Sequence, residues 1–163
     1  MNTLAQAYAE IADTPIEDGT SNAAFNLVDR ILEEQGEMEI ADWVIDSSPS
    51  TIPWRDVATV LAIMIWSTSD NGAGIMREAE RWLREGVDEQ RIFVALNLDV
   101  YPFLDSKEME ECLRNASEKF PTQTELCLSL ISSRKNAAKQ ALVSSSDKRG
   151  WVASLRAFFR RRG

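Results

Sequence analysis

Residues 53–67 read PWRDVATVLAIMIWS, and this stretch decides the fold because it is apolar on nearly every side of a helix. Pro53 suits the first turn of a helix, where its missing N–H removes no hydrogen bond. A helix that is apolar all round is normally buried at the centre of a domain. The apolar run from Val57 to Trp66 is shorter than the roughly 20 residues that cross a bilayer. We therefore expect a central core helix.

The sequence on both sides of this stretch also repeats apolar residues at helical spacing. Gly36 and Gly86 stand where glycine ends a helix, and Asp88 and Asp105 stand where a side-chain oxygen caps the next one. Thr122-x-x-Glu125 is a stricter capping box, which predicts that a long helix opens there and runs to about residue 143. No stretch alternates with the period of a strand. The sequence predicts an all-α fold of seven or eight helices, as an irregular antiparallel bundle or a short stack of helix hairpins.

The length of 163 residues fits a single compact domain. We expect residues 1–143 to form an acidic helical domain. Residues 144–163 comprise a Ser-rich linker and a basic amphipathic helix, which we expect to pack on that domain.

Charge is divided unevenly along the chain. Residues 1–133 carry a net charge of −16 and residues 134–163 carry +8, which gives −8 for the whole protein. An acidic body repels nucleic acid and attracts basic protein surfaces. We therefore expect no direct binding to nucleic acid, and a basic protein as the partner.

The composition argues against several kinds of chemistry. The chain has no histidine, which is the commonest general base and metal ligand. Cys112 and Cys127 alone cannot make a four-ligand zinc site. We expect them to be buried thiols of a reducing compartment, and Met1–Leu4 do not begin a signal peptide, so we expect a cytoplasmic protein. The sequence shows no paired nucleophile and base. We predict a protein that is not an enzyme and that needs no metal or cofactor.

One stretch has the spacing of a calcium-binding loop. Ser67, Ser69 and Asn71 precede Gly72 at position six, and Glu78 stands at position twelve. Calcium needs carboxylates at the first positions, and here these positions are serines. We therefore expect a turn between two helices, with Glu78 on the polar side of the second.

Two surfaces remain as candidates for function. The first is an acidic ridge around the predicted helix end at Gly36, where a cluster of carboxylates can speed association with a cationic partner. Inhibitors and immunity proteins that cover a basic toxin or nuclease act in this way. The alternative is a solvated surface without a specific partner. The residues of the acidic ridge are Glu33, Glu34, Glu37, Glu39, Asp42 and Asp46.

The second surface is the basic tail, residues 147–163. An apolar face with arginines at its edge is typical of a helix that lies on a membrane surface or in a groove of a partner. The alternative is that this helix docks on the acidic body of its own chain. Membrane contact is expected only through this segment. The docking residues are Trp151, Leu155, Arg156, Phe158, Phe159 and Arg160.

Overall fold

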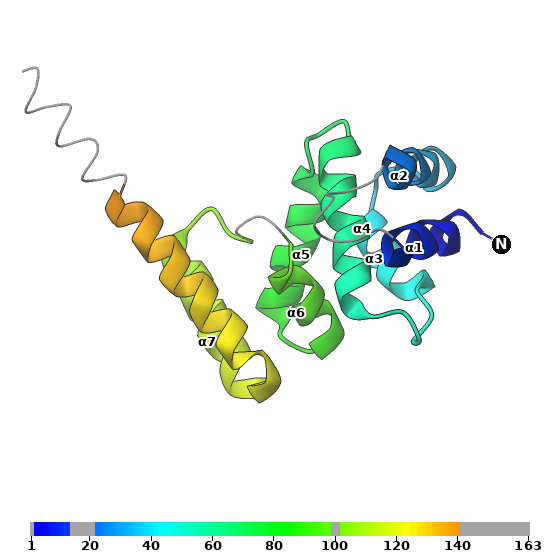
Figure 1. Cartoon of the computed structure of the whole chain (residues 1–163). Coiled ribbons are helices and arrows are strands. Elements are labelled where there is room, and N and C mark those ends of the chain that lie inside the picture. The colour runs from blue at the N-terminus through cyan, green and yellow to red at the C-terminus, as the bar shows by residue number, and fades with distance from the viewer. Residues whose placement is uncertain (1, 14–21, 99–101, 141–163) are drawn as a thin grey trace, which may run out of the picture.

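The computed structural model describes residues 2–13, 22–98 and 102–140, and these ranges hold eight α-helices, one short 3₁₀-helix and no strand (Figure 1). The prediction of an all-α fold is confirmed, and the helices form an irregular bundle. The elements are α1 (Thr3–Asp13), α2 (Asn22–Gln35), α3 (Ile40–Ser47), α4 (Trp54–Ser67), α5 (Ala73–Glu85), α6 (Glu89–Leu96), α7 (Ser106–Lys119), the 3₁₀-helix η2 (Pro121–Gln123) and a final helix over residues 124–140.

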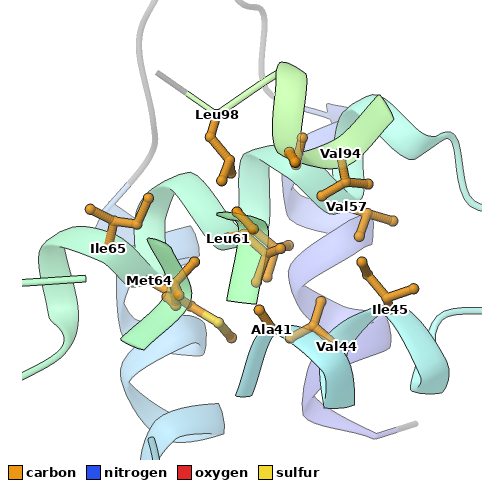
Figure 2. Packing of buried hydrophobic residues seen from close by; sticks show 14 of the residues in the cluster. Ala41, Val44, Ile45, Val57, Leu61, Met64, Ile65, Val94 and Leu98 are labelled. Atoms are coloured by element: carbon orange, nitrogen blue, oxygen red, sulfur yellow. The ribbon is translucent and has the colours of Figure 1, made fainter. Parts of the chain in front are cut away.

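Helix α4 is the centre of the bundle, as its sequence predicts. It packs against α1, α2, α3, α5 and α6. Val57, Leu61 and Met64 are completely buried, and Figure 2 shows them between apolar side chains such as Val44 of α3 and Val94 of α6. Burying each such side chain contributes roughly 1.5–3 kcal/mol. The core therefore fixes the positions of α3 and α5, which carry the candidate site.

The ends of the helices follow the local signals in the sequence. Gly36 and Gly86 adopt left-handed conformations with φ of +80° and +58°, and each donates its N–H back to a carbonyl of the preceding helix. Asp88 caps α6 by accepting from the N–H groups of Gln90 and Arg91. Asp105 caps α7 in the same way. These four predictions are confirmed.

The predicted capping box at Thr122 is wrong. Pro121 opens the 3₁₀-helix η2, and the α-helix begins only at Thr124. The Thr122 hydroxyl donates instead to the carboxylate of Glu89 on α6, so a tertiary contact replaces the local cap.

Helix α7 and the helix over residues 124–140 form an antiparallel hairpin that extends away from the bundle (Figure 1). Arg134 donates to the carbonyls of Phe103 and Leu104, which ties the two legs together. The hairpin meets the bundle at α5, where Arg84 pairs with Glu108 at 2.7 Å. In the described ranges, no helix is both long enough and apolar enough to cross a membrane.

Candidate functional site

The candidate site is built around the connection between α2 and α3. Gly36 ends α2, and Glu37, Met38 and Glu39 then lead into α3. We call these three residues the acidic turn. Glu39 adopts a left-handed conformation, with φ of +54°, which is strained for a side chain other than Gly, Asn or Asp. Strain of this kind persists only where the surrounding structure holds it.

One of the contacts that hold the acidic turn comes from the connection between α4 and α5. The Glu37 carboxylate accepts from the backbone N–H of Ser69 at 2.9 Å and from its hydroxyl at 2.7 Å. These bonds join two turns that lie 32 residues apart in the sequence. The acidic turn is therefore fixed to the neighbouring turn of the bundle.

A second contact comes from Glu78 on α5, which is only 8% exposed. Its carboxylate accepts from the N–H of Asp42 at 2.8 Å and from that of Ala41 at 3.4 Å. The N-terminus of a helix favours negative charge, and Glu39 supplies no side-chain cap to α3. Burial raises the pKa of Glu78 and outweighs the two N–H donors, which lower it. The carboxylate of Glu78 therefore caps α3 from another helix.

The two carboxylates of α3, Asp42 and Asp46, pair with side chains of α5 and α6. Asp42 accepts from the indole Nε1 of Trp82 at 2.9 Å, from Arg91 at 3.3 Å and from Arg81. Burial alone raises the pKa of Asp42, but the hydrogen bonds from Arg81 and Trp82 prevail and lower it. Asp46 pairs with Arg91 at 2.7 Å. This network joins α3 to α5 and α6.

A cavity of about 510 Å³ opens beside the acidic turn. Met38 stands at its edge with 89% of its surface exposed. Carboxylates outnumber guanidinium groups in the lining, so an incoming cation meets acceptors on several sides. The lining residues are Glu37, Met38, Glu39, Asp70, Gly74, Arg77, Glu78 and Arg81.

The structure divides the predicted acidic ridge into three parts. Glu37 and Glu39 lie together at the cavity, whereas Asp42 and Asp46 are bound by arginines of α5 and α6. Glu33 and Glu34 are exposed on α2. Glu34 pairs with Arg30 and also accepts from the hydroxyl of Thr3 at 3.0 Å. Only the middle of the ridge therefore borders the cavity.

Two carboxylates of this cavity, Asp70 and Glu78, were not predicted as part of the acidic ridge. The expectation that Glu78 lies on the polar side of its helix is wrong, because its side chain is buried against α3. The available signal is its spacing, three residues after Ile75 and four before Trp82, which places all three on one face of α5. Asp70, in the turn before α5, accepts from the N–H of Gly74 in the first turn of that helix at 2.7 Å.

The residues predicted for tail docking, from Trp151 to Arg160, lie outside the described residues, as does the predicted linker. Within the described ranges, no group of three Cys, Asp or Glu side chains is placed to hold a metal ion. Chemically, the arrangement at the acidic turn offers hydrogen-bond acceptors for a cation beside one exposed apolar side chain.

Comparisons of the chain with protein-family models, with curated proteins and with solved structures gave no match. A proposal for the function therefore rests on the geometry of the site alone.

Proposed function

We propose that this protein is a non-enzymatic interaction module whose acidic turn binds and neutralises a basic protein partner, in the manner of an inhibitor or an immunity protein. The observation that carries the proposal is the exposed Met38, which stands between two carboxylates at the edge of a cavity. Carboxylates that surround a concave surface attract a cation and speed its association. An adaptable methionine side chain supplies apolar contact once the partner has docked.

The rigidity of the acidic turn supports the same proposal. The hydrogen bonds of Glu37 to Ser69 and of Glu78 to the start of α3 hold the turn in place, so less conformational entropy is lost when a partner binds. The left-handed conformation of Glu39 is a strain of the kind found at binding sites. We also propose a cytoplasmic location, which the free thiols of Cys112 and Cys127 support.

The test uses the full chain as bait in native lysate at low and high salt, followed by binding measurements with the purified partner. The matched variants are Glu39→Gln and Met38→Ala at the acidic turn, with Glu118→Gln, an exposed position on α7, as the control. We expect Glu39→Gln to slow association severalfold at low salt, because exposed charges act mainly on the association rate. Met38→Ala should speed dissociation.

The proposal is contradicted if the affinity does not depend on salt concentration. It is also contradicted if Glu118→Gln weakens binding as much as Glu39→Gln does. Recovery of an acidic partner alone contradicts it equally.

A second candidate function is that of an adaptor held to a membrane surface or a partner groove by the basic tail. The last helix carries the chain to the end of the hairpin that lies far from α1–α4 (Figure 1), and residues 136–140 are all exposed there. This position leaves the segment that follows room to meet another surface. Co-sedimentation of the full chain and of residues 1–146 with anionic liposomes tests the idea, and equal binding by both rejects it.

A further inference from the structure

A second cavity lies along the outward face of α4 and shares no lining residue with the one at the acidic turn. Arg55, Thr59, Ala62 and Trp66 follow at intervals that place them on one stripe of the helix. The volume is about 350 Å³, at the lower end of the range for small-molecule sites, roughly 300–1,000 Å³. The lining also includes Ile63 of α4, Phe25 of α2 and Asn97, which follows α6.

One end of this cavity is aromatic. Trp66 is 76% exposed, whereas Trp82 is buried in the core and the side chains of Trp43 and Trp54 are half-buried. The ring of Phe25 is also half-buried. An indole left in water beside a concave surface offers a large apolar contact that folding does not use.

The other end of the cavity is cationic. Among the described residues, the guanidinium of Arg55 is the only arginine side chain without a hydrogen bond or ion pair. Every other described arginine pairs with a carboxylate or donates to a backbone carbonyl. Those arginines are Arg30, Arg77, Arg81, Arg84, Arg91, Arg114 and Arg134.

The two uncharged polar side chains of the lining are already engaged within the protein. The Thr59 hydroxyl donates to the carbonyl of Arg55 at 3.0 Å, and the Asn97 amide donates to the carbonyl of Phe93 at 2.8 Å. Ala62 adds only a methyl group. Among the described residues of the lining, the guanidinium of Arg55 is therefore the one charged donor that can bind a ligand.

We propose that this cavity binds an elongated amphipathic organic acid. The carboxylate of the ligand pairs with the guanidinium of Arg55, because a guanidinium binds a carboxylate through two parallel hydrogen bonds. The apolar part of the ligand lies over Ala62 and against the rings of Trp66 and Phe25. Three helical turns separate Arg55 from Trp66, about 16 Å at 1.5 Å per residue, so the ligand is a chain rather than a single ring. This proposal is independent of the binding of a basic protein at the acidic turn.

The test titrates decanoate into the full-length protein and follows the backbone amide and indole signals by two-dimensional NMR. We expect shifts at Thr59, Ala62 and the indole of Trp66. Arg55→Gln should weaken decanoate binding about tenfold, the loss typical of one charge-assisted pair. Arg55→Lys should recover part of it, and Trp66→Ala should also weaken it.

Two comparisons isolate the ion pair. Decanol lacks the carboxylate, so it should bind the original protein more weakly than decanoate does. Arg55→Gln should leave the affinity for decanol unchanged. Arg114→Gln removes an exposed arginine from α7 and should leave decanoate binding unchanged. Unchanged amide spectra show that the variants are folded. The proposal is overturned if decanoate does not bind, or if it shifts the NMR signals of residues elsewhere in the protein. It is also overturned if decanoate binds Arg55→Gln as tightly as it binds the original protein.

Discussion

The carboxylate of Asp42 on α3 accepts a hydrogen bond from the indole nitrogen of Trp82 on α5 at 2.9 Å. The indole is almost completely buried, so this nitrogen has no access to water in place of Asp42. The same carboxylate accepts from Arg81 and Arg91. Asp42 therefore holds together the two helices that flank the cavity at the acidic turn.

Asp42→Ala should lower the free energy of unfolding by about 1–3 kcal/mol, because it leaves a buried N–H donor without an acceptor. Asp46→Ala is the matched control on the same helix. Asp46 is exposed and pairs with Arg91 alone, so its loss should remove less than about 1 kcal/mol. Urea denaturation of both variants measures the difference, and equal losses would show that the indole contact is unimportant.

The pH dependence of stability should show the contribution of Asp42 under acidic conditions. Its pKa is lowered in the folded protein, so its ionised form contributes stability at pH values above the ordinary pKa of aspartate, about 3.9. This contribution should disappear as the pH falls through the lowered pKa. The stability gap between the original protein and Asp42→Asn should therefore narrow in acid, as measured by urea denaturation between about pH 2 and 6.

The contribution of Glu78 to stability should change with pH in the direction opposite to that of Asp42, and at higher pH. Its pKa is raised by burial, so the folded state binds its proton more tightly than the unfolded chain does. Stability from this group should therefore decrease as the pH rises from the ordinary pKa of glutamate, about 4.3, through the raised one. Glu78→Gln cannot ionise and should lack this decrease. Urea denaturation of both proteins over this pH range tests the prediction. A constant difference in their free energies of unfolding would reject it.

Gly72 and Gly36 both adopt left-handed conformations. Substitution by alanine should nevertheless lower stability by different amounts at the two positions. A Cβ at Gly72 would lie 2.6 Å from Cγ2 of Ile65, whereas a Cβ at Gly36 meets nothing within 4 Å. Gly72→Ala should therefore cost about 2–4 kcal/mol from strain and overpacking. Gly36→Ala should cost only about 1 kcal/mol from backbone strain. Thermal or urea unfolding compares the two, and similar losses would mean that Ile65 moves aside easily.

Glu39→Asn tests whether the strained residue of the acidic turn serves binding rather than stability. Asparagine tolerates the left-handed conformation better than glutamate does, so the free energy of unfolding should stay level or rise by about 0.5 kcal/mol. Association with a basic partner should nevertheless slow, because a carboxylate at the cavity is lost. A fall in stability of more than about 1 kcal/mol would instead assign Glu39 a structural role.

The helix ends were predictable because their causes are local. Gly36, Gly86, Asp88 and Asp105 each act within one turn of their own helix, so the sequence around them contains the whole signal. The predicted cap at Thr122 was wrong because the partner of Thr122 is Glu89 on another helix. Local spacing carries no information about such a contact.

The candidate site was predictable only in part for the same reason. Charge density identified Glu37 and Glu39, but it did not separate them from Asp42, whose partners lie 39 to 49 residues further along the chain. Glu78 lies on an apolar face, and its buried position depends on the N-terminus of α3. Arrangements that join distant segments require the packed structure.

Helix α5 packs against α3, α4, α6 and α7, so within the described residues it borders both the cavity at the acidic turn and the hairpin. Its buried side chains are Ile75, Glu78, Ala79, Trp82 and Leu83, whereas Arg77 and Arg81 are exposed. In a library of all single substitutions, α5 should therefore tolerate changes at its exposed positions far better than at these five buried ones. Substitutions that alter partner binding without loss of stability should likewise fall on exposed residues at the cavity, such as Met38, Glu39 and Arg77.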